Sequence, residues 1–382
     1  MDTTDLDQSL ATLSAQARKW AQLPIREKLG LLQSCIDGTA RAAARQVAAA
    51  CQAKGLKLDS SHAGEEWLGG PVITLRAMRQ LHDSLSALAA GKSPIERIAR
   101  RTRDDGQVVA EIFPTNKLDG AMYQGFSAEL WMEPGVTEAN LEANIGEFYR
   151  QDAPDGAVAL VLGAGNVASI GPLDVVHKLW VEGQVTLLKW NPVNDYLGPF
   201  FEEAFAPLFE RGYLRSAYGG ADVGAYLTAH PSVDEIHITG SGATHDAIVY
   251  GVGEDGAQRK SDDRPQSDKR ITSELGNVSP VIVVPGAWSD AQLRGQAENI
   301  ATQLTNNCGF NCNAAKVLVL PEGWALADRL MEDLRRVLAE LPQRPAYYPG
   351  AEGRYDAFLG DKPQAIEVGD RSAGVLPYVL IP

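Results

Sequence analysis

Cysteine is scarce in this sequence, with 4 residues among 382. Small domains that depend on disulfides use a much larger share of their chain for cysteine, so a disulfide framework is excluded. The four positions also lack the spacing of a structural zinc site, and we expect no metal. They are Cys35, Cys51, Cys308 and Cys312.

Long apolar runs and an excess of basic charge are also lacking. No run of about 18 apolar residues is present, as a membrane-spanning helix would need, and the acidic start MDTTDLDQSL does not resemble a signal peptide. Lys and Arg total 35 against 49 Asp and Glu, a formal net charge of −14. A surface of that sign repels nucleic acid and anionic lipid. We therefore expect a cytoplasmic protein with no nucleic-acid or membrane partner.

What the sequence does contain is an ordinary globular composition, 45% hydrophobic and 22% charged, over a length typical of two to three domains. The first hundred residues predict helices, because apolar residues after Gly69-Gly70-Pro71 recur at spacings of three and four. This stripe comprises Leu75, Met78, Leu81, Leu85 and Leu88. Residues 107–113 and a short run ending at Trp131-Met132 predict two strands.

From residue 157 short apolar runs alternate with helix-length segments, which is typical of buried parallel strands joined by crossover helices. We expect strands at 157–162, 185–189, 214–218 and 235–239, which together predict a doubly wound nucleotide-binding domain. Residues 253–270 carry many charges of both signs, and we expect a solvated loop there.

A second α/β unit is expected after residue 271. Apolar runs at 281–284 and 317–320 predict strands, about 290–305 predicts a helix, and an amphipathic helix is expected to end before Pro342. The predicted fold class is therefore α/β. Residues 1–271 are expected to hold a helical N-terminal region and the nucleotide-binding domain, and residues 272–382 the second domain.

Gly163-Ala164-Gly165 follows the first expected parallel strand and suggests a dinucleotide-binding turn. A full fingerprint needs a further glycine at position 168, where Ala stands, so a tight turn without a ligand is the alternative. Asn166 comes next, at the strand end where open α/β sheets bind ligands. Its side chain either stabilises the turn or donates to an oxyanion.

Cys308 and Cys312 lie in a segment of small residues, 307–316, between an expected helix and an expected strand. A thiol in such a turn is open to a substrate, and nearby backbone N–H groups can stabilise a developing oxyanion. The alternative is a buried, inert thiol.

Several short motifs occur in a fixed order along the chain. Each has an ordinary structural explanation when taken alone, such as a helix cap or a surface carboxylate. They are Asn166, Lys189, Thr239-Gly240-Ser241, Glu274-Leu275-Gly276 with Ser279-Pro280, and Asn307 with Gly309 and Cys312. Together they resemble the motif series of the NAD(P)-dependent aldehyde dehydrogenase superfamily, specifically from about residue 157 to 320 and more loosely over the N-terminal region.

The resemblance implies an aldehyde-dehydrogenase-like fold, a Rossmann-type cofactor domain followed by a catalytic α/β domain. It implies that Cys312 is the nucleophile and that Asn166 and the backbone N–H of Cys312 hold the oxyanion. It implies that Glu274 is the general base, a role that requires a buried carboxylate. The cofactor contacts that it implies are Lys189, Thr239, Gly240, Ser241 and Leu275.

The sequence departs from the family pattern at several points. Pro192 stands where NAD-preferring members often carry a Glu, so the cofactor is NAD or NADP. Phe310 replaces the usual Gln and Asn277 the usual Gly, as expected of a divergent branch. The chain ends at Pro382 without the Glu-x-Phe segment and the interface strand of family members, so the resemblance implies a fragment or a shortened protein.

The expected function is oxidation of an aldehyde to a carboxylic acid with NAD or NADP, through a cysteine thiohemiacetal and thioester. One alternative is a coenzyme A-acylating aldehyde dehydrogenase or acyl-thioester reductase, since 163–167 departs from the Pro-Trp-Asn type of the hydrolytic enzymes. Another is a catalytically silent dinucleotide-binding protein. Cys308 either packs or forms a reversible disulfide with Cys312. The expected partners are a small aldehyde and further copies of the chain.

Overall fold

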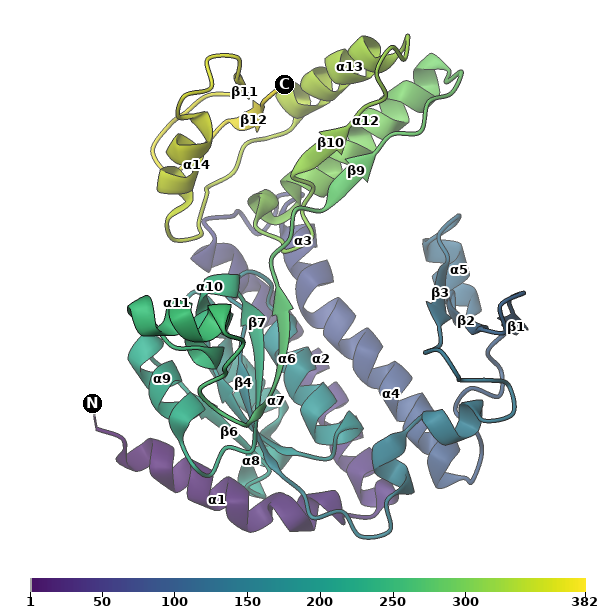
Figure 1. Ribbon diagram of the computed structural model, residues 1–382, viewed down its shortest axis with the longest axis vertical. Coiled ribbons are helices and arrows are strands. Elements are labelled where there is room, and N and C mark those ends of the chain that lie inside the picture. Colours follow the sequence, from purple (N-terminus) through teal and green to yellow (C-terminus); the bar gives the residue numbers. More distant parts are fainter. Residues whose placement is uncertain (1) are drawn as a thin grey trace.

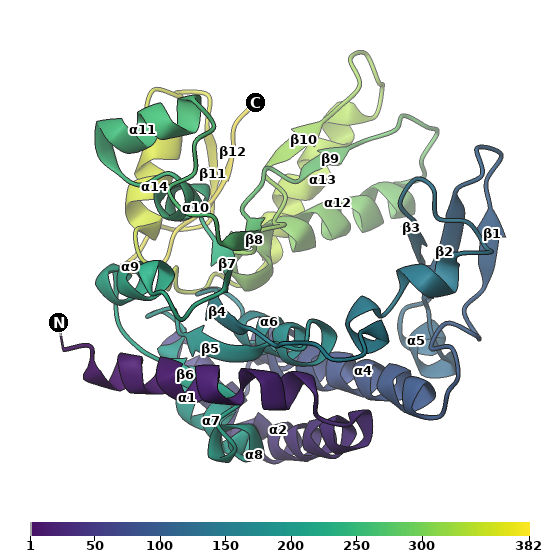
Figure 2. The same cartoon turned by 60° about the horizontal axis from the view of Figure 1, so that its bottom comes forward.

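The computed structural model describes residues 2–382 and shows a large lower body, a smaller upper unit and a projecting arm (Figure 1). The lower body holds the N-terminal helices and a central parallel sheet. The upper unit contains the chain from β9 onward, and the arm is the small sheet of β1, β2 and β3 (Figure 2).

The N-terminal region is helical, as predicted. Its helices are α1 (Thr4–Ala21), α2 (Ile25–Ala53), α3 (Ala63–Trp67) and α4 (Ile73–Ala89), and a π-helical turn, Leu68–Val72, joins the last two. The predicted apolar stripe on α4 faces the core: Met78 and Leu85 are buried, while the leucines between and beside them pack partly buried against it. The helices therefore cover the sheet through one shared hydrophobic core.

The central sheet has five parallel strands in the order β6-β5-β4-β7-β8. Their bounds are β4 (Val158–Leu162), β5 (Val185–Lys189), β6 (Leu214–Ala217), β7 (Glu235–Gly240) and β8 (Arg270–Leu275). Every residue of β4 and β5 is buried, which explains why these strands are apolar on both faces. The chain runs outward from β4 in both directions, so the switch point of a doubly wound sheet lies at the carboxyl ends of β4 and β7.

Crossover helices connect these strands. They are α6 (Ile170–Val176), continued by a π-helical turn at His177–Val181, α7 (Gly198–Ala204), α8 (Ala206–Glu210), α9 (Ala221–Ala229) and α10 (Gly242–Val249). Single 3₁₀ turns lie at Leu141–Asn144, Glu147–Arg150 and Asp195–Leu197. The predicted doubly wound parallel sheet is confirmed.

The prediction of a loop over 253–270 is wrong in its first half, where α11 (Gly253–Ser261) forms. Acidic residues occupy its first turn and Arg259 and Lys260 its last, so both ends complement the helix dipole. Strand β8 then begins at Arg270, so the expected domain division at residue 272 falls inside a strand of the central sheet.

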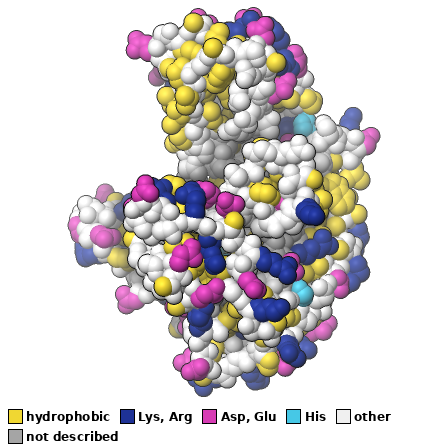
Figure 3. All heavy atoms as spheres, turned by 90° about the vertical axis from the view of Figure 1, so that its right-hand side faces the viewer, with side chains coloured by type: hydrophobic (Ala, Val, Ile, Leu, Met, Phe, Trp, Pro, Cys, Tyr) yellow, Lys and Arg dark blue, Asp and Glu magenta, His cyan; other side chains and the backbone are white. Residues whose placement is uncertain are grey.

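The upper unit has a core of its own, centred on Leu293, Leu330, Leu334 and Leu338. Its parallel strands β9 (Pro280–Ile282) and β10 (Val317–Val319) pack with α12 (Asp290–Thr305) and α13 (Ala327–Glu340), close to the predicted bounds. The last forty residues add α14 (Ala351–Leu359) and the antiparallel pair β11 (Ile366–Val368) and β12 (Tyr378–Leu380). Figure 3 shows the upper unit as a separate lobe with hydrophobic side chains on the visible face.

The arm is an antiparallel sheet of β1 (Arg100–Thr102), β2 (Val108–Phe113) and β3 (Ala128–Trp131), with α5 (Lys117–Met122) between the last two strands. The two strands predicted here are confirmed, and β1 was not anticipated. Within residues 2–382, no helix has the length and hydrophobicity needed to cross a membrane.

Candidate active site

The carboxyl ends of the central strands open onto a cavity of about 1270 Å³, which residues of the upper unit close from the other side. Seven of the eight predicted site residues line it: Asn166, Lys189, Thr239, Gly240, Ser241, Glu274 and Cys312. Leu275 is the exception, because it is half-buried in β8 opposite Gly240 and is not part of the lining. The motifs that the sequence spreads over 147 positions thus meet at one place.

Gly165 is required by close packing at the mouth of this cavity. A Cβ atom at this position would lie 2.7 Å from Asn191 Oδ1 and 2.8 Å from the hydroxyl of Tyr348. The glycine therefore lets a side chain from β5's end and one from the C-terminal segment approach the same backbone turn.

Asn166 is anchored by both its side chain and its backbone. Its Nδ2 donates to the carbonyl of Phe310 at 2.9 Å, which ties it to the segment just before Cys312. Its own carbonyl accepts from Asn307 Nδ2 and from the Tyr347 hydroxyl, both at 2.9 Å. An amide group has two N–H donors, so one remains for a substrate oxygen.

The turn before Cys312 has an unusual backbone. Asn307, Cys308 and Gly309 have φ values of 51°, 57° and 72°, three consecutive left-handed residues. Each non-glycine residue in this region costs about 1–2 kcal/mol, so surrounding contacts must hold the turn. One such contact is Lys316 Nζ, which donates to the Gly309 carbonyl at 2.8 Å.

The two thiols of this turn differ in accessibility. Cys312 is exposed and lines the cavity. Cys308 is half-buried and does not line it, and burial raises the pKa of its thiol. A substrate in the cavity therefore has access to Cys312.

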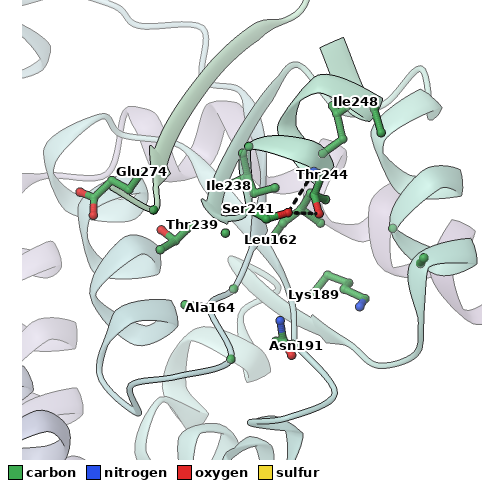
Figure 4. A pocket seen from close by; sticks show the side chains of 18 of the residues that line it. Leu162, Ala164, Lys189, Asn191, Ile238, Thr239, Ser241, Thr244, Ile248 and Glu274 are labelled. Carbon is green, nitrogen blue, oxygen red and sulfur yellow. Dashed lines mark hydrogen bonds between the residues drawn. The ribbon is translucent and has the colours of Figure 1, made fainter. Parts of the chain in front are cut away.

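Glu274 does not have the surroundings expected of a general base. It is exposed on β8, the edge strand of the sheet, so the expected burial of this carboxylate is wrong. Figure 4 shows its carboxylate pointing away from Lys189 and Ser241. The edge strand β8 has no buried residue, in contrast to β4 and β5, so it offers no buried position to this carboxylate.

Lys189 and Ser241 lie on the opposite side of the cavity from Glu274 (Figure 4). Lys189 is buried at the end of β5, and burial lowers its pKa while the carboxylates of Asp222 and Asp195 oppose that shift. Ser241 is the N-cap of α10, and its Oγ accepts from the backbone N–H of Thr244 at 3.1 Å. The remaining N–H groups of the first turn are left to bind a phosphate.

The charge of the lining favours an anionic ligand. Four cationic side chains line the cavity, against Glu274 as the single carboxylate among the described lining residues. The cations are Lys189, Lys269, Lys316 and Arg354. Among residues 2–382, no group of three His, Cys, Asp or Glu side chains is arranged to hold a metal ion.

Sequence reasoning missed several lining residues. Asn191 follows Lys189 by two positions at the same strand end, and that position was the available signal. Tyr348 and Arg354 come from the C-terminal segment, which has no periodicity and no motif. Only the folded chain brings that segment to the cavity.

Comparison with known proteins identifies relatives of this chain. Residues 192–351 match the aldehyde dehydrogenase family. The chain is 26% identical over 281 residues to the N-succinylglutamate 5-semialdehyde dehydrogenase of Sphingopyxis alaskensis, covering 70% of this chain and 50% of that protein. It is 30% identical over 220 residues to the coniferyl aldehyde dehydrogenase of a Pseudomonas species, covering 56% and 40% respectively.

Solved structures share the fold at lower sequence identity. NADP-dependent glyceraldehyde-3-phosphate dehydrogenase from Bacillus halodurans, complexed with NADP, has a TM-score of 0.65 at 15% identity, covering 99% of this chain and 69% of that one. Aldehyde dehydrogenase C from Pseudomonas syringae, complexed with NAD+ and octanal, has a TM-score of 0.58 at 14% identity, covering 88% and 55%.

The chain thus spans about half the length of the first of these curated relatives. The α/β architecture with its parallel sheet agrees with the fold of these structural neighbours. Over residues 192–351 the chain is similar to the aldehyde dehydrogenase family, and its fold is similar to that of solved aldehyde dehydrogenases.

Proposed function

We propose that this protein oxidises an aldehyde to a carboxylic acid with NAD or NADP, using Cys312 as the nucleophile. The observation that carries the proposal is the shared cavity, in which an accessible thiol, the anchored amide of Asn166 and the buried ammonium of Lys189 line one continuous space.

The cavity suits a dinucleotide in size, charge and shape. Its wall along α9 consists of small residues, which leave room for a flat ring system: Gly220, Ala221, Gly224 and Ala225. Lys189 would bind a ribose, and the N-terminus of α10 with Ser241 would bind a phosphate. When bound, the cofactor supplies the hydride acceptor. Structural relatives crystallised with NAD+ and with NADP support either form.

The chain's own residues account for the carbonyl chemistry. The Cys312 thiolate would attack the carbonyl carbon, and the new C–S bond turns the carbonyl oxygen into an oxyanion. The free N–H of Asn166 and the backbone N–H of Cys312 would stabilise that charge. Loss of hydride then leaves a thioester on Cys312, which water hydrolyses with the proton going to a base.

Rapid mixing of short, long and aromatic aldehydes with NAD or NADP tests this function. We expect a burst of reduced-nicotinamide absorbance that Cys312→Ala abolishes while cofactor binding persists. Cys308→Ala is the matched control, because it removes the neighbouring thiol outside the cavity, and it should keep the burst. Undiminished turnover in Cys312→Ala would rule out this mechanism.

A second candidate function follows from the position of Glu274. Because its carboxylate is exposed and points away from the cavity's cationic side, a thiol such as coenzyme A is an alternative acceptor for the thioester. Product formation that requires added thiol would favour this acylating reaction. Steady turnover in water alone would favour hydrolysis with Glu274 as the base.

We also propose that the protein acts in the cytoplasm as a homo-oligomer. Four free cysteines, two of them buried, support a reducing compartment. Exposed apolar side chains on the arm support self-association, among them Leu118, Phe126 and Trp131. Light scattering during gel filtration measures the oligomeric state.

A further inference from the structure

Lys54 is a buried lysine that no predicted motif includes. It caps the C-terminal end of α2, and its side chain is 4% exposed. Its Nζ donates to Glu66 Oε1 at 2.9 Å, to Asn307 Oδ1 at 3.1 Å and to the Asn166 carbonyl at 3.3 Å. An ammonium has three N–H donors, so each of them has an acceptor.

The acceptors belong to three separate segments. Glu66 lies in α3, Asn166 follows β4, and Asn307 opens the left-handed turn that leads to Cys312. Asn307 Nδ2 donates in turn to the Asn166 carbonyl, and the Tyr347 ring lies 4.9 Å from Lys54 Nζ. One ammonium therefore joins the oxyanion loop to the nucleophile turn.

The side chain of Glu65, next to Glu66 in α3, binds the backbone of the same turn. Its Oε2 accepts from the backbone N–H of Asn307 at 2.8 Å and from Arg344 Nη1 at 2.6 Å. Lys54 therefore binds the side chain of Asn307 and Glu65 binds its backbone N–H, and together they hold the left-handed turn. Glu65 on α3 and Lys54 at the C-cap of α2 supply these contacts, and neither residue lines the cavity.

A buried charge needs a reason to be retained, because an apolar side chain of similar volume avoids the cost of desolvation. Burial lowers the pKa of Lys54, and the carboxylate of Glu66 opposes that shift. The three directed donors supply what an apolar side chain lacks, which is a fixed distance between two backbone segments 141 residues apart.

We propose that Lys54, with its counter-ion Glu66, is a positioning residue of the active site. It holds the Cys312 turn against the Asn166 loop, so that the thiol and the oxyanion donor keep a set spacing. The effect on catalysis rests on the proposed function, whereas the effect on the turn does not.

The test compares Lys54→Met with Lys28→Met at pH 7. Lys28 is an equally buried lysine, and its Nζ donates to the Ala21 carbonyl, away from the site. We expect Lys54→Met to lower kcat on the order of 10–100-fold, as small misplacements of reacting groups do, with KM for the cofactor within about threefold. Hydrogen exchange of residues 306–312 should become faster in Lys54→Met and stay unchanged in Lys28→Met.

The double variant Lys54→Met/Glu66→Met keeps the test decisive where the single variant does not fold, because it removes both charges of the buried pair. We expect it to fold and still show fast exchange at 306–312 and low kcat. Unchanged exchange at 306–312 in a folded Lys54 variant, or an equal change in Lys28→Met, overturns the proposal. If the native protein shows no aldehyde turnover, the proposed function fails while exchange still decides the role of Lys54.

Discussion

Asn166 makes two separable sets of contacts. Its backbone carbonyl joins the cluster around Lys54, Asn307 and Tyr347, whereas its side chain makes a single hydrogen bond, to Phe310. A substitution at this residue can therefore remove the proposed oxyanion donor and leave the loop's main-chain anchors in place. The catalytic effect of the Asn166 side chain can therefore be measured separately from any effect on the fold.

We predict that Asn166→Ala lowers kcat on the order of 10²–10³-fold, the usual loss when one oxyanion donor is removed. Cofactor affinity and the free energy of unfolding should change little, because the backbone contacts persist. Single-turnover kinetics and fluorescence titration measure these quantities. A loss of kcat below about threefold would show that Asn166 is not the oxyanion donor.

Lys28 predicts a pH dependence of stability. Its Nζ lies 4.3 Å from the Phe148 ring centroid and 5.1 Å from that of Trp20, and burial lowers its pKa from 10.5 to about 8. Between these two values the unfolded chain binds the proton and the folded chain does not. The free energy of unfolding should therefore rise with pH from about 8 to about 10.5, in total on the order of 3 kcal/mol.

Urea unfolding at pH 7, 8, 9 and 10 measures this rise. Lys28→Met lacks the titrating ammonium, so its free energy of unfolding should not show this rise. Above pH 8 the native protein should therefore gain stability relative to the variant. Parallel pH profiles for the two proteins would show that Lys28 keeps its ordinary pKa.

The site residues that the sequence predicts correctly are those that stand in a short, contiguous family motif. Cys312, Lys189 and Ser241 each stand in a short recognisable segment, and all three line the cavity. Lys54 could not be found in this way, because its partner Asn307 is 253 residues away and neither stands in a motif together with the other. Burial of Glu274 was expected wrongly, because exposure depends on the sheet order.

At the scale of elements, α10 and α12 offer a matched pair of helix caps. Ser241 accepts from the backbone N–H of Thr244, and Ser289 forms a reciprocal capping box with Gln292. Both serines stabilise a helix, but only Ser241 lines the cavity.

We predict that Ser241→Ala and Ser289→Ala each lower the free energy of unfolding by about 1 kcal/mol, the ordinary value of an N-cap. Only Ser241→Ala should also weaken cofactor binding, by up to about tenfold, which corresponds to one hydrogen bond. Urea unfolding and cofactor titration of both variants measure this contrast. Equal cofactor affinities in the two variants would show that Ser241 acts as a cap alone.

The sequence predicts the bounds of helices and strands that have an apolar pattern, but it does not predict the helix that is almost entirely polar. The bounds of β5 and α12 match the predictions, because continuous burial marks β5 and one apolar stripe marks α12. Helix α11 was missed because it buries only Gly256 and is stabilised by charges at its two ends. Its sequence pattern is therefore typical of a loop.

At the scale of the whole molecule, two separate cores flank the cavity. One core comprises the central sheet and the helices packed on it, and the other lies among α12, α13 and β11. The cavity takes Lys189 and Ser241 from the first unit and Cys312 and Arg354 from the second. A ligand that fills it therefore contacts both units.

This arrangement predicts that the cofactor stabilises the entire molecule. At a cofactor concentration one hundred times Kd, the free energy of unfolding should rise by about 2.7 kcal/mol, because only the folded chain binds. Hydrogen exchange should slow both near the start of α10 and at residues 309–312, which line the cavity from opposite units. Lys189→Met should lose most of this gain through weaker binding. Protection confined to the first unit would mean that the cofactor does not reach the Cys312 side, which would favour a binding protein over an enzyme.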